Sequence, residues 1–226
     1  AAATGRMAGA EALVRWLHPG RGLVSPGTFI PFAEETGMIV DIGEIVLRQA
    51  CRDLRRFGAA SAGFKMALNL SPRQFRQTGL VHRIEEVCAA EGIDPAQLEI
   101  EITEGAMMAD VAGAIPMLDQ IKTLGCMISI DDFGTGYSSL AYVKQLPVDY
   151  LKIDRSFVRD LAVDLADQAI AKTIVTMSHS LGLRVIAEGV ETQEQLEFLK
   201  QLDCDEIQGF LLGKPMPSDD LNALLR

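Results

Sequence analysis

Residues 127–139 read Met-Ile-Ser-Ile-Asp-Asp-Phe-Gly-Thr-Gly-Tyr-Ser-Ser. The apolar start is typical of a buried strand, and the glycines indicate a loop before a helix that begins near Ser138. Two adjacent carboxylates at the mouth of such a strand repel each other and are costly to bury without a partner. A divalent cation such as Mg²⁺, which prefers carboxylate and amide oxygens, would remove this cost. The alternative is a solvated strand end, at which the same residues only form a turn and bind no metal.

The length and composition of the chain are those of one large α/β domain. It has 226 residues, of which 48% are hydrophobic and 23% are charged, which leaves ample material for a core. The net charge of −10 argues against a nucleic-acid polymer or an anionic membrane surface as partner, because both attract basic patches. A small anionic ligand held through metal ions stays compatible with this charge.

Cysteines and histidines are few and scattered. The sequence has no C-x-x-C spacing, and its four cysteines indicate reduced core residues of a cytoplasmic domain: Cys51, Cys88, Cys126 and Cys204. The three histidines lie far apart in sequence, which argues against a histidine-built zinc site. We see no signal peptide and no membrane-spanning apolar run. We expect residues 1–226 to form a single domain, which is compatible with a longer, membrane-anchored parent protein.

Strand and helix patterns alternate seven times along the chain, which is typical of βα units and a mostly parallel sheet. We predict a (β/α) TIM-type barrel, one unit short of the usual eight. An open doubly wound sheet is the rival, but no G-x-G-x-x-G follows the first strand. The predicted strands are 7–16, 64–70, 98–103, 127–132, 148–153, 183–189 and 205–211. The predicted helices are 28–36, 38–57, 72–76, 79–91, 111–124, 138–145, 165–181, 192–202 and 218–225, with 18–27 as a loop.

Each predicted strand carries at least one polar residue at its C-terminal end, and in a barrel these ends meet on one face. The set is Glu11, Asn69, Glu101, Asp131, Asp132, Lys152, Glu188 and Gln208. Five carboxylates gathered there would be unstable without cations. Two Mg²⁺ or Mn²⁺ ions that share a bridging carboxylate would make the set coherent.

The same residues stand in a series of segments that resembles the EAL domain, the cyclic-di-GMP phosphodiesterase family. The segments are Glu11-Ala12-Leu13 with Arg15-Trp16, Asn69-Leu70-Ser71, Glu101-Ile102-Thr103-Glu104, residues 131–139, Leu151-Lys152-Ile153-Asp154, residues 187–192 and Gln208-Gly209-Phe210. The resemblance covers essentially the whole chain. It implies an enzyme that linearises cyclic di-GMP to 5′-pGpG with two metal ions.

The resemblance also implies metal ligands. Glu11, Asn69, Glu101 and Asp131 match the ligands of a first metal, and Asp131 would bridge to a second metal that is held with Asp132 and Glu188. Mg²⁺ or Mn²⁺ is expected to support turnover, whereas Ca²⁺ is expected to inhibit it.

Other residues match catalytic, substrate-binding and loop-stabilising positions. Lys152 matches the lysine that holds or helps deprotonate the attacking water, and burial is expected to depress its pKa; a plain salt bridge to a neighbouring carboxylate is the alternative. Leu13, Arg15 and Gln208 match substrate contacts. Glu104 and Glu191 match residues that steady the 133–139 loop, which the family links to a homodimer contact near 138–145.

One departure from the family is visible. The strand that usually precedes the turn at Thr4-Gly5-Arg6 is missing, which explains the count of seven and predicts an open barrel edge. Two other functions compete with the leading one: a receptor that binds cyclic di-GMP without cutting it, and another metal-dependent barrel enzyme, for instance one that abstracts a proton next to a carboxylate. The parent chain is expected to carry further sensory or signalling domains.

Overall fold

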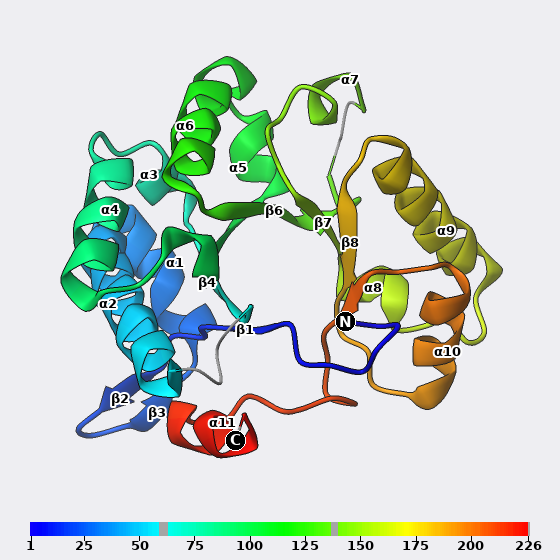
Figure 1. Cartoon of the computed structure of the whole chain (residues 1–226), viewed down its shortest axis with the longest axis horizontal. Helices are drawn as coiled ribbons and strands as arrows, with labels where there is room; N and C mark the ends of the chain where they lie inside the picture. The colour runs from blue at the N-terminus through cyan, green and yellow to red at the C-terminus, as the bar shows by residue number, and fades with distance from the viewer. Residues whose placement is uncertain (59–62, 137–139, 226) are drawn as a thin grey trace.

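A single parallel sheet, curled into a barrel, organises the molecule. The computed structural model describes residues 1–58, 63–136 and 140–225. Its seven parallel strands follow the order β1-β4-β5-β6-β7-β8-β9, and helices surround them on the outside (Figure 1). Among the described residues the sheet does not close on itself, because β1 and β9 are its two edges. The prediction of a (β/α) barrel with seven units is confirmed, and the open seam lies between β1 and β9.

The elements alternate as the sequence predicts. The barrel strands are β1 (Gly9–Glu11), β4 (Lys65–Asn69), β5 (Leu98–Thr103), β6 (Met127–Phe133), β7 (Tyr150–Ile153), β8 (Arg184–Ala187) and β9 (Glu206–Ile207). The helices are α1 (Pro26–Thr36), α2 (Ile39–Phe57), α3 (Pro72–Phe75), α4 (Leu80–Glu91), α5 (Glu104–Met108), α6 (Val111–Leu124), α7 (Leu140–Val143), α8 (Arg155–Val158), α9 (Leu165–Ser180), α10 (Gln193–Gln201) and α11 (Ser218–Leu224), with a 3-10 turn, η2 (Pro95–Gln97). The short helices α5 and α8 were not predicted. No helix in the described ranges is both long and apolar enough to cross a membrane.

The prediction of one strand over 7–16 is wrong. β1 ends at Glu11, and the chain leaves the sheet before it forms the antiparallel hairpin of β2 (Trp16–His18) and β3 (Gly22–Val24). Part of the predicted loop 18–27 is therefore strand β3. The alternation of side chains continues through the break, so the pattern alone did not reveal where the backbone pairing stops. The Trp16 ring packs edge-on against Phe29 of α1 at 5.7 Å, which holds the hairpin to that helix.

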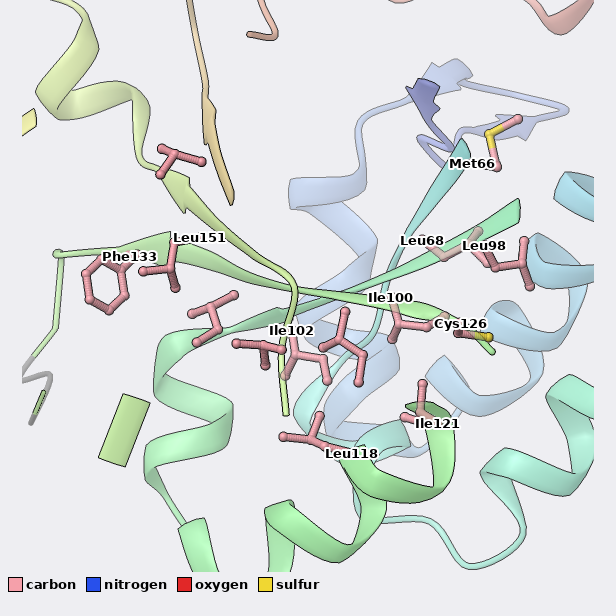
Figure 2. Close-up of a cluster of buried hydrophobic side chains, with 14 of the residues drawn as sticks. Met66, Leu68, Leu98, Ile100, Ile102, Leu118, Ile121, Cys126, Phe133 and Leu151 are labelled. Atoms are coloured by element: carbon pink, nitrogen blue, oxygen red, sulfur yellow. The ribbon is translucent and has the colours of Figure 1, made fainter. Parts of the chain in front are cut away.

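The two faces of the sheet differ sharply in polarity. On β5, Leu98, Ile100 and Ile102 face outward and are buried, because side chains alternate along a strand. Figure 2 shows these three side chains beside Leu118 and Ile121 of α6, in the apolar layer between sheet and helices. The alternate residues of β5, among them Glu99 and Glu101, face the barrel interior. The apolar core thus lies outside the barrel, and the interior is free to be polar.

Several strands are followed directly by a residue that caps the next helix, and this cap fixes the direction of the chain there. Ser71 caps α3 through a reciprocal capping box with Gln74, directly after β4 delivers Asn69. The Gln74 side chain lies against Gly43 of α2 so closely that a Cβ atom at Gly43 would collide with it. After β7, the side chain of Asp154 accepts the backbone N–H of Ser156 and caps α8. The four cysteines are buried free thiols, as predicted.

Candidate active site

Lys152 stands at the centre of the predicted site. Its side chain is 1% exposed, and its Nζ lies 2.6 Å from Glu101 Oε1 and 2.6 Å from Glu188 Oε1. Asp131 Oδ1 is 3.3 Å away. These four residues come from β5, β6, β7 and the end of β8. The structure therefore gathers strand ends around one buried ammonium group.

Glu11, Asn69 and Gln208 lie next to this cluster, toward the seam of the barrel. Asn69 pairs in register with Glu101, and Glu11 is close enough to Lys152 to raise its pKa. Asn69 Nδ2 donates to Glu11 Oε1, and Gln208 Nε2 donates to Glu11 Oε2 at 2.7 Å. Glu11 ends β1, and Gln208 directly follows β9. Glu11 thus accepts one hydrogen bond from a side-chain amide of the neighbouring strand β4 and one from a side-chain amide across the seam.

A β-bulge turns both aspartates of the Asp131-Asp132 pair toward the site. In a regular strand, adjacent side chains would point to opposite faces. Here the register between β6 and β7 shifts between Ile130 and Phe133, and Asp132 adopts a φ of 54° in the left-handed region. This conformation is unusual for a residue other than glycine, though aspartate tolerates it better than most. The bulge is what makes two consecutive carboxylates available at one place.

The loop after the bulge is held by hydrogen bonds that compensate for the unusual backbone. Thr135 Oγ1 donates to the carbonyl oxygen of Asp132 at 2.8 Å. The buried Glu104 side chain accepts the backbone N–H of Gly134 through Oε2 at 3.0 Å. A Cβ atom at Gly136 would lie only 2.8 Å from Glu104 Oε1, so a side chain there would push against the carboxylate that holds Gly134. Residues 137–139 lie outside the described residues.

Burial and mutual repulsion raise the pKa of several carboxyl groups in the site. Burial raises the pKa of Glu101 well above its ordinary value, although the Lys152 ammonium opposes the shift. The pKa of Glu188 is raised to about 7, again chiefly by burial. Burial, together with the neighbouring charges of Asp131 and Asp154, raises the pKa of Asp132. These raised pKa values show that it is unfavourable to hold all of these carboxyl groups ionised beside the single Lys152 ammonium.

The prediction of a depressed Lys152 pKa is wrong for this arrangement. Burial alone would lower the pKa, but the carboxylates of Glu101, Glu188 and Asp131 more than offset it, and the pKa lies well above its ordinary value. Lys152 is therefore charged at neutral pH. The salt-bridge alternative describes the observed contacts.

Asp154 is a residue of this site that the sequence reasoning missed. It ends the Leu151-Lys152-Ile153-Asp154 segment directly after β7, two positions beyond Lys152. Its carboxyl group lies close enough to that of Asp132 to hydrogen-bond with it and raise its pKa. The signal was present, because residues two apart on a strand share a face.

Three predicted residues lie apart from the carboxylate cluster. Leu13 and Arg15 fall in the connection after β1, and both are exposed. Arg15 Nη1 donates to the carbonyl oxygen of the preceding residue, Val14, at 2.9 Å. Glu191 is also exposed, and its backbone N–H donates to Gln195 Oε1 at 2.7 Å as α10 begins. Their substrate-binding and loop-stabilising roles stay predictions.

The donor set suits hard divalent cations. Carboxylates outnumber ammonium groups, and Glu101 Oε2 is buried without a hydrogen-bond partner among the described residues. An oxygen of this kind needs a donor or a cation. No group of three or more Asp, Glu, His or Cys side chains in the described ranges is already arranged as a metal cage; the Lys152 ammonium lies among these carboxylates instead. The side chains are of the kind that binds metal ions, and the Lys152 ammonium balances part of their negative charge.

Comparisons with known proteins place this site in a family. The EAL domain family matches residues 1–215. The chain is 48% identical over 98% of its length to the bifunctional diguanylate cyclase/cyclic di-GMP phosphodiesterase MucR of Pseudomonas aeruginosa, of which it covers 33%. It is 44% identical over its full length to the cyclic di-GMP phosphodiesterase NbdA of the same organism, of which it covers 29%. The chain thus spans about a third of the length of these relatives.

Solved structures agree with the sequence matches. The structure described as the PaMucR phosphodiesterase in complex with c-di-GMP superposes with a TM-score of 0.91 at 48% identity, covering 96% of this chain and 88% of that one. The FimX EAL domain from Pseudomonas aeruginosa, solved bound to c-di-GMP, gives a TM-score of 0.82 at 28% identity, covering 91% of this chain and 82% of that one. With the family match, the fold and the gathered strand ends in agreement, this chain belongs to the EAL domain family.

Proposed function

We propose that this domain hydrolyses cyclic di-GMP to linear 5′-pGpG with the help of two divalent metal ions, Mg²⁺ or Mn²⁺. The observation that carries the proposal is the gathering of Glu101, Asp131 and Glu188 around Lys152 at the C-terminal end of the barrel. Phosphodiesterases of this family depend on divalent metals, and two relatives are named cyclic di-GMP phosphodiesterases. The sequence departs at none of the family positions for the metals or the lysine.

The chain offers ligands for two ions that share one carboxylate. The first ion would be held by Glu11, Asn69, Glu101 and Asp131; the second would be held by Asp131, Asp132 and Glu188. When bound, such a pair would supply charge neutralisation, an activated water and stabilisation of the leaving oxygen. The bulge at Asp132 supports the shared role of Asp131, because it lets neighbouring carboxylates serve neighbouring ions.

Lys152 would hold the attacking water in place. Its raised pKa favours this holding role over proton abstraction, since an ammonium group donates hydrogen bonds and cannot accept a proton. Its bonds to Glu101 and Glu188 fix the ammonium between two strands. The water would thereby be oriented toward phosphorus by an ammonium group that carboxylates of two strands hold in place.

The substrate would lie across the exposed edge of the site. Arg15 is positioned beyond the end of β1, where its charge suits a phosphate of the dinucleotide, and the neighbouring Leu13 offers an apolar contact. Gln208 stands at the seam beside Glu11. These contacts would orient the ring so that one phosphodiester faces Lys152.

The test is a turnover assay with cyclic di-GMP, analysed by separation of the nucleotides, with Mg²⁺, Mn²⁺ and Ca²⁺ in parallel. We expect 5′-pGpG with Mg²⁺ and Mn²⁺, and binding without turnover with Ca²⁺, because its flexible coordination holds water and phosphate in poorer geometry. Asp131→Asn should abolish turnover. Full hydrolysis by this variant would contradict the two-metal assignment, and tight binding without turnover under every metal would favour the receptor alternative.

We propose further that the domain acts as a homodimer within a longer signalling protein. The loop that Glu104 holds at Gly134 leads into α7, the region that the resemblance links to dimer contacts. The relatives are roughly three times as long as this chain, which is compatible with additional domains. Light scattering over a concentration series tests the dimer, and a monomer at the highest concentration would count against it.

A further inference from the structure

A second charged cluster lies inside the barrel near the starts of the strands, away from the strand ends that form the site. Lys65 Nζ contacts Glu99 Oε2 at 3.1 Å, the Tyr150 hydroxyl at 2.5 Å and Glu206 Oε1 at 3.4 Å. The Arg184 guanidinium lies 4.1 Å from the centre of the Tyr150 ring. We call these five residues the floor cluster. It balances two acidic side chains with two basic ones.

Ser129 lies between the floor cluster and the site. On β6 it pairs with Glu101 of β5 and with Tyr150 of β7. It is two residues before Asp131, so its side chain shares the inward face. Ser129 therefore lies beside Glu101, and Glu99 is the next inward-facing residue before Glu101 on the neighbouring strand.

Two polar side-chain atoms here are buried without a hydrogen-bond partner among the described residues. The Ser129 side chain is 0% exposed, and its Oγ has no hydrogen-bond partner within the described ranges; the same holds for Oε1 of Glu99, which is 3% exposed. A hydroxyl needs an acceptor and a carboxylate oxygen needs a donor, and buried polar groups are rarely left unmatched. A water molecule is both donor and acceptor, and it is the usual solution at such positions.

We propose that Ser129 and Glu99 bind an ordered water molecule beneath Glu101, and that Ser129 is through this water a positioning residue for the Glu101 carboxylate. Lys65 holds the other oxygen of Glu99 at 3.1 Å, so that Oε1 is left for the water. Glu101 keeps one oxygen on Lys152, and its second oxygen, which is buried without a partner among the described residues, is the group that the water would hold. The water site itself is independent of the proposed function; its consequence for metal binding rests on that function.

The first test is a high-resolution crystal structure of the metal-free protein, with Ser129→Ala crystallised alongside it. We expect an ordered water within hydrogen-bond distance of Ser129 Oγ and Glu99 Oε1 in the wild type. Its loss or displacement is expected in Ser129→Ala. A direct hydrogen bond between Ser129 and either carboxylate, with no water, would overturn the inference.

The second test is the affinity for Mn²⁺, measured by calorimetry. Groups that orient metal ligands typically contribute about 10-fold or more to metal affinity, so Ser129→Ala should bind Mn²⁺ about 10-fold more weakly. The matched control is Ser178→Ala, since Ser178 is equally buried but donates to the carbonyl oxygen of Ile174 within α9. Its Mn²⁺ affinity should stay that of the wild type.

The outcomes separate the inference from the proposed function. Equal Mn²⁺ affinity in wild type and Ser129→Ala would overturn the positioning role, even with the water in place. If the wild type neither bound Mn²⁺ nor hydrolysed cyclic di-GMP, the proposed function would fail. The metal-free crystal structure would still decide the water site.

Discussion

Gln208 Nε2 donates a hydrogen bond of 2.7 Å to Glu11 Oε2, and the two residues lie 197 positions apart in sequence. They stand at the ends of β1 and β9, the two edges of the sheet, which are not paired with each other. A side-chain bond therefore joins the edges where the backbone does not. It also makes the orientation of a predicted metal ligand depend on the last strand of the barrel.

Gln208→Ala should remove the side-chain hydrogen bond that joins the ends of β1 and β9. We expect the free energy of unfolding to fall by about 1 kcal/mol, the usual net value of one such hydrogen bond. The affinity for Mn²⁺ should also fall, because Glu11 loses the group that orients it. Denaturant unfolding and calorimetry measure the two effects. The control is Gln168→Ala, which removes a comparable hydrogen bond, of 2.7 Å, from a side-chain amide to the carbonyl oxygen of Leu161. An equal loss of metal affinity in the control would contradict the role of the Gln208–Glu11 hydrogen bond.

Asp132→Asn should lower the catalytic activity and leave the stability of the metal-free protein unchanged or slightly higher. Asparagine tolerates the left-handed backbone at this position, and the substitution removes a charge that burial and the neighbouring carboxylates of Asp131 and Asp154 disfavour. We expect metal-free stability to stay within about 0.5 kcal/mol of the wild type or to rise. Turnover should fall about 100-fold or more, since a ligand charge is lost. Wild-type turnover in this variant would remove Asp132 from the metal site.

Lys152→Ala should destabilise the metal-free protein by about 3–5 kcal/mol, because it leaves buried carboxylates without their cation. Mn²⁺ should restore much of this stability by taking over the charge, which thermal unfolding with and without the metal measures. Turnover should slow while cyclic di-GMP binding stays largely intact. Lys122→Ala serves as the control, since Lys122 pairs with Asp149 at 2.7 Å outside the site. An unchanged rate in Lys152→Ala would leave this lysine only a structural role.

The floor cluster predicts a loss of stability at alkaline pH. Burial would lower the pKa of Lys65, but Glu99, Tyr150 and Glu206 raise it above its ordinary 10.5. Burial chiefly raises the pKa of Tyr150 above its ordinary 10.0. Groups with a raised folded-state pKa stabilise fully below their unfolded pKa and lose this contribution as pH rises through the folded one. The free energy of unfolding should therefore fall above about pH 10.

Denaturant unfolding between pH 8 and pH 11.5 checks this dependence. Lys65→Gln should be about 3 kcal/mol less stable at pH 8, because Glu99 loses its partner, and its stability should fall less steeply above pH 10. Lys172→Gln, on the exposed face of α9, should follow the wild-type curve. Parallel curves for all three proteins would show that the floor cluster does not set the alkaline limit.

The sequence by itself determined the architecture and most of the side chains that the structure gathers at the strand ends. Alternating βα patterns predict parallel strands, and parallel strands bring their C-terminal ends to one edge. Glu101, Lys152 and Glu188 could therefore be named from their positions at strand ends. Side-chain alternation also separated Glu101 from Ile100 and Ile102, which pack outside the barrel.

Only the tertiary structure decided how these groups affect one another. The bulge at Asp132 is a register shift between β6 and β7, and a local pattern does not encode register with a strand that follows later. The high pKa of Lys152 arises from carboxylates on other strands, so its burial alone predicted the wrong direction. Lys65, Glu99 and Tyr150 meet inside the barrel, although nothing in its own segment marks any of them as part of a cluster. Electrostatic energies and hydrogen bonds depend on distances of a few ångströms between strands far apart in sequence, and folding alone sets those distances.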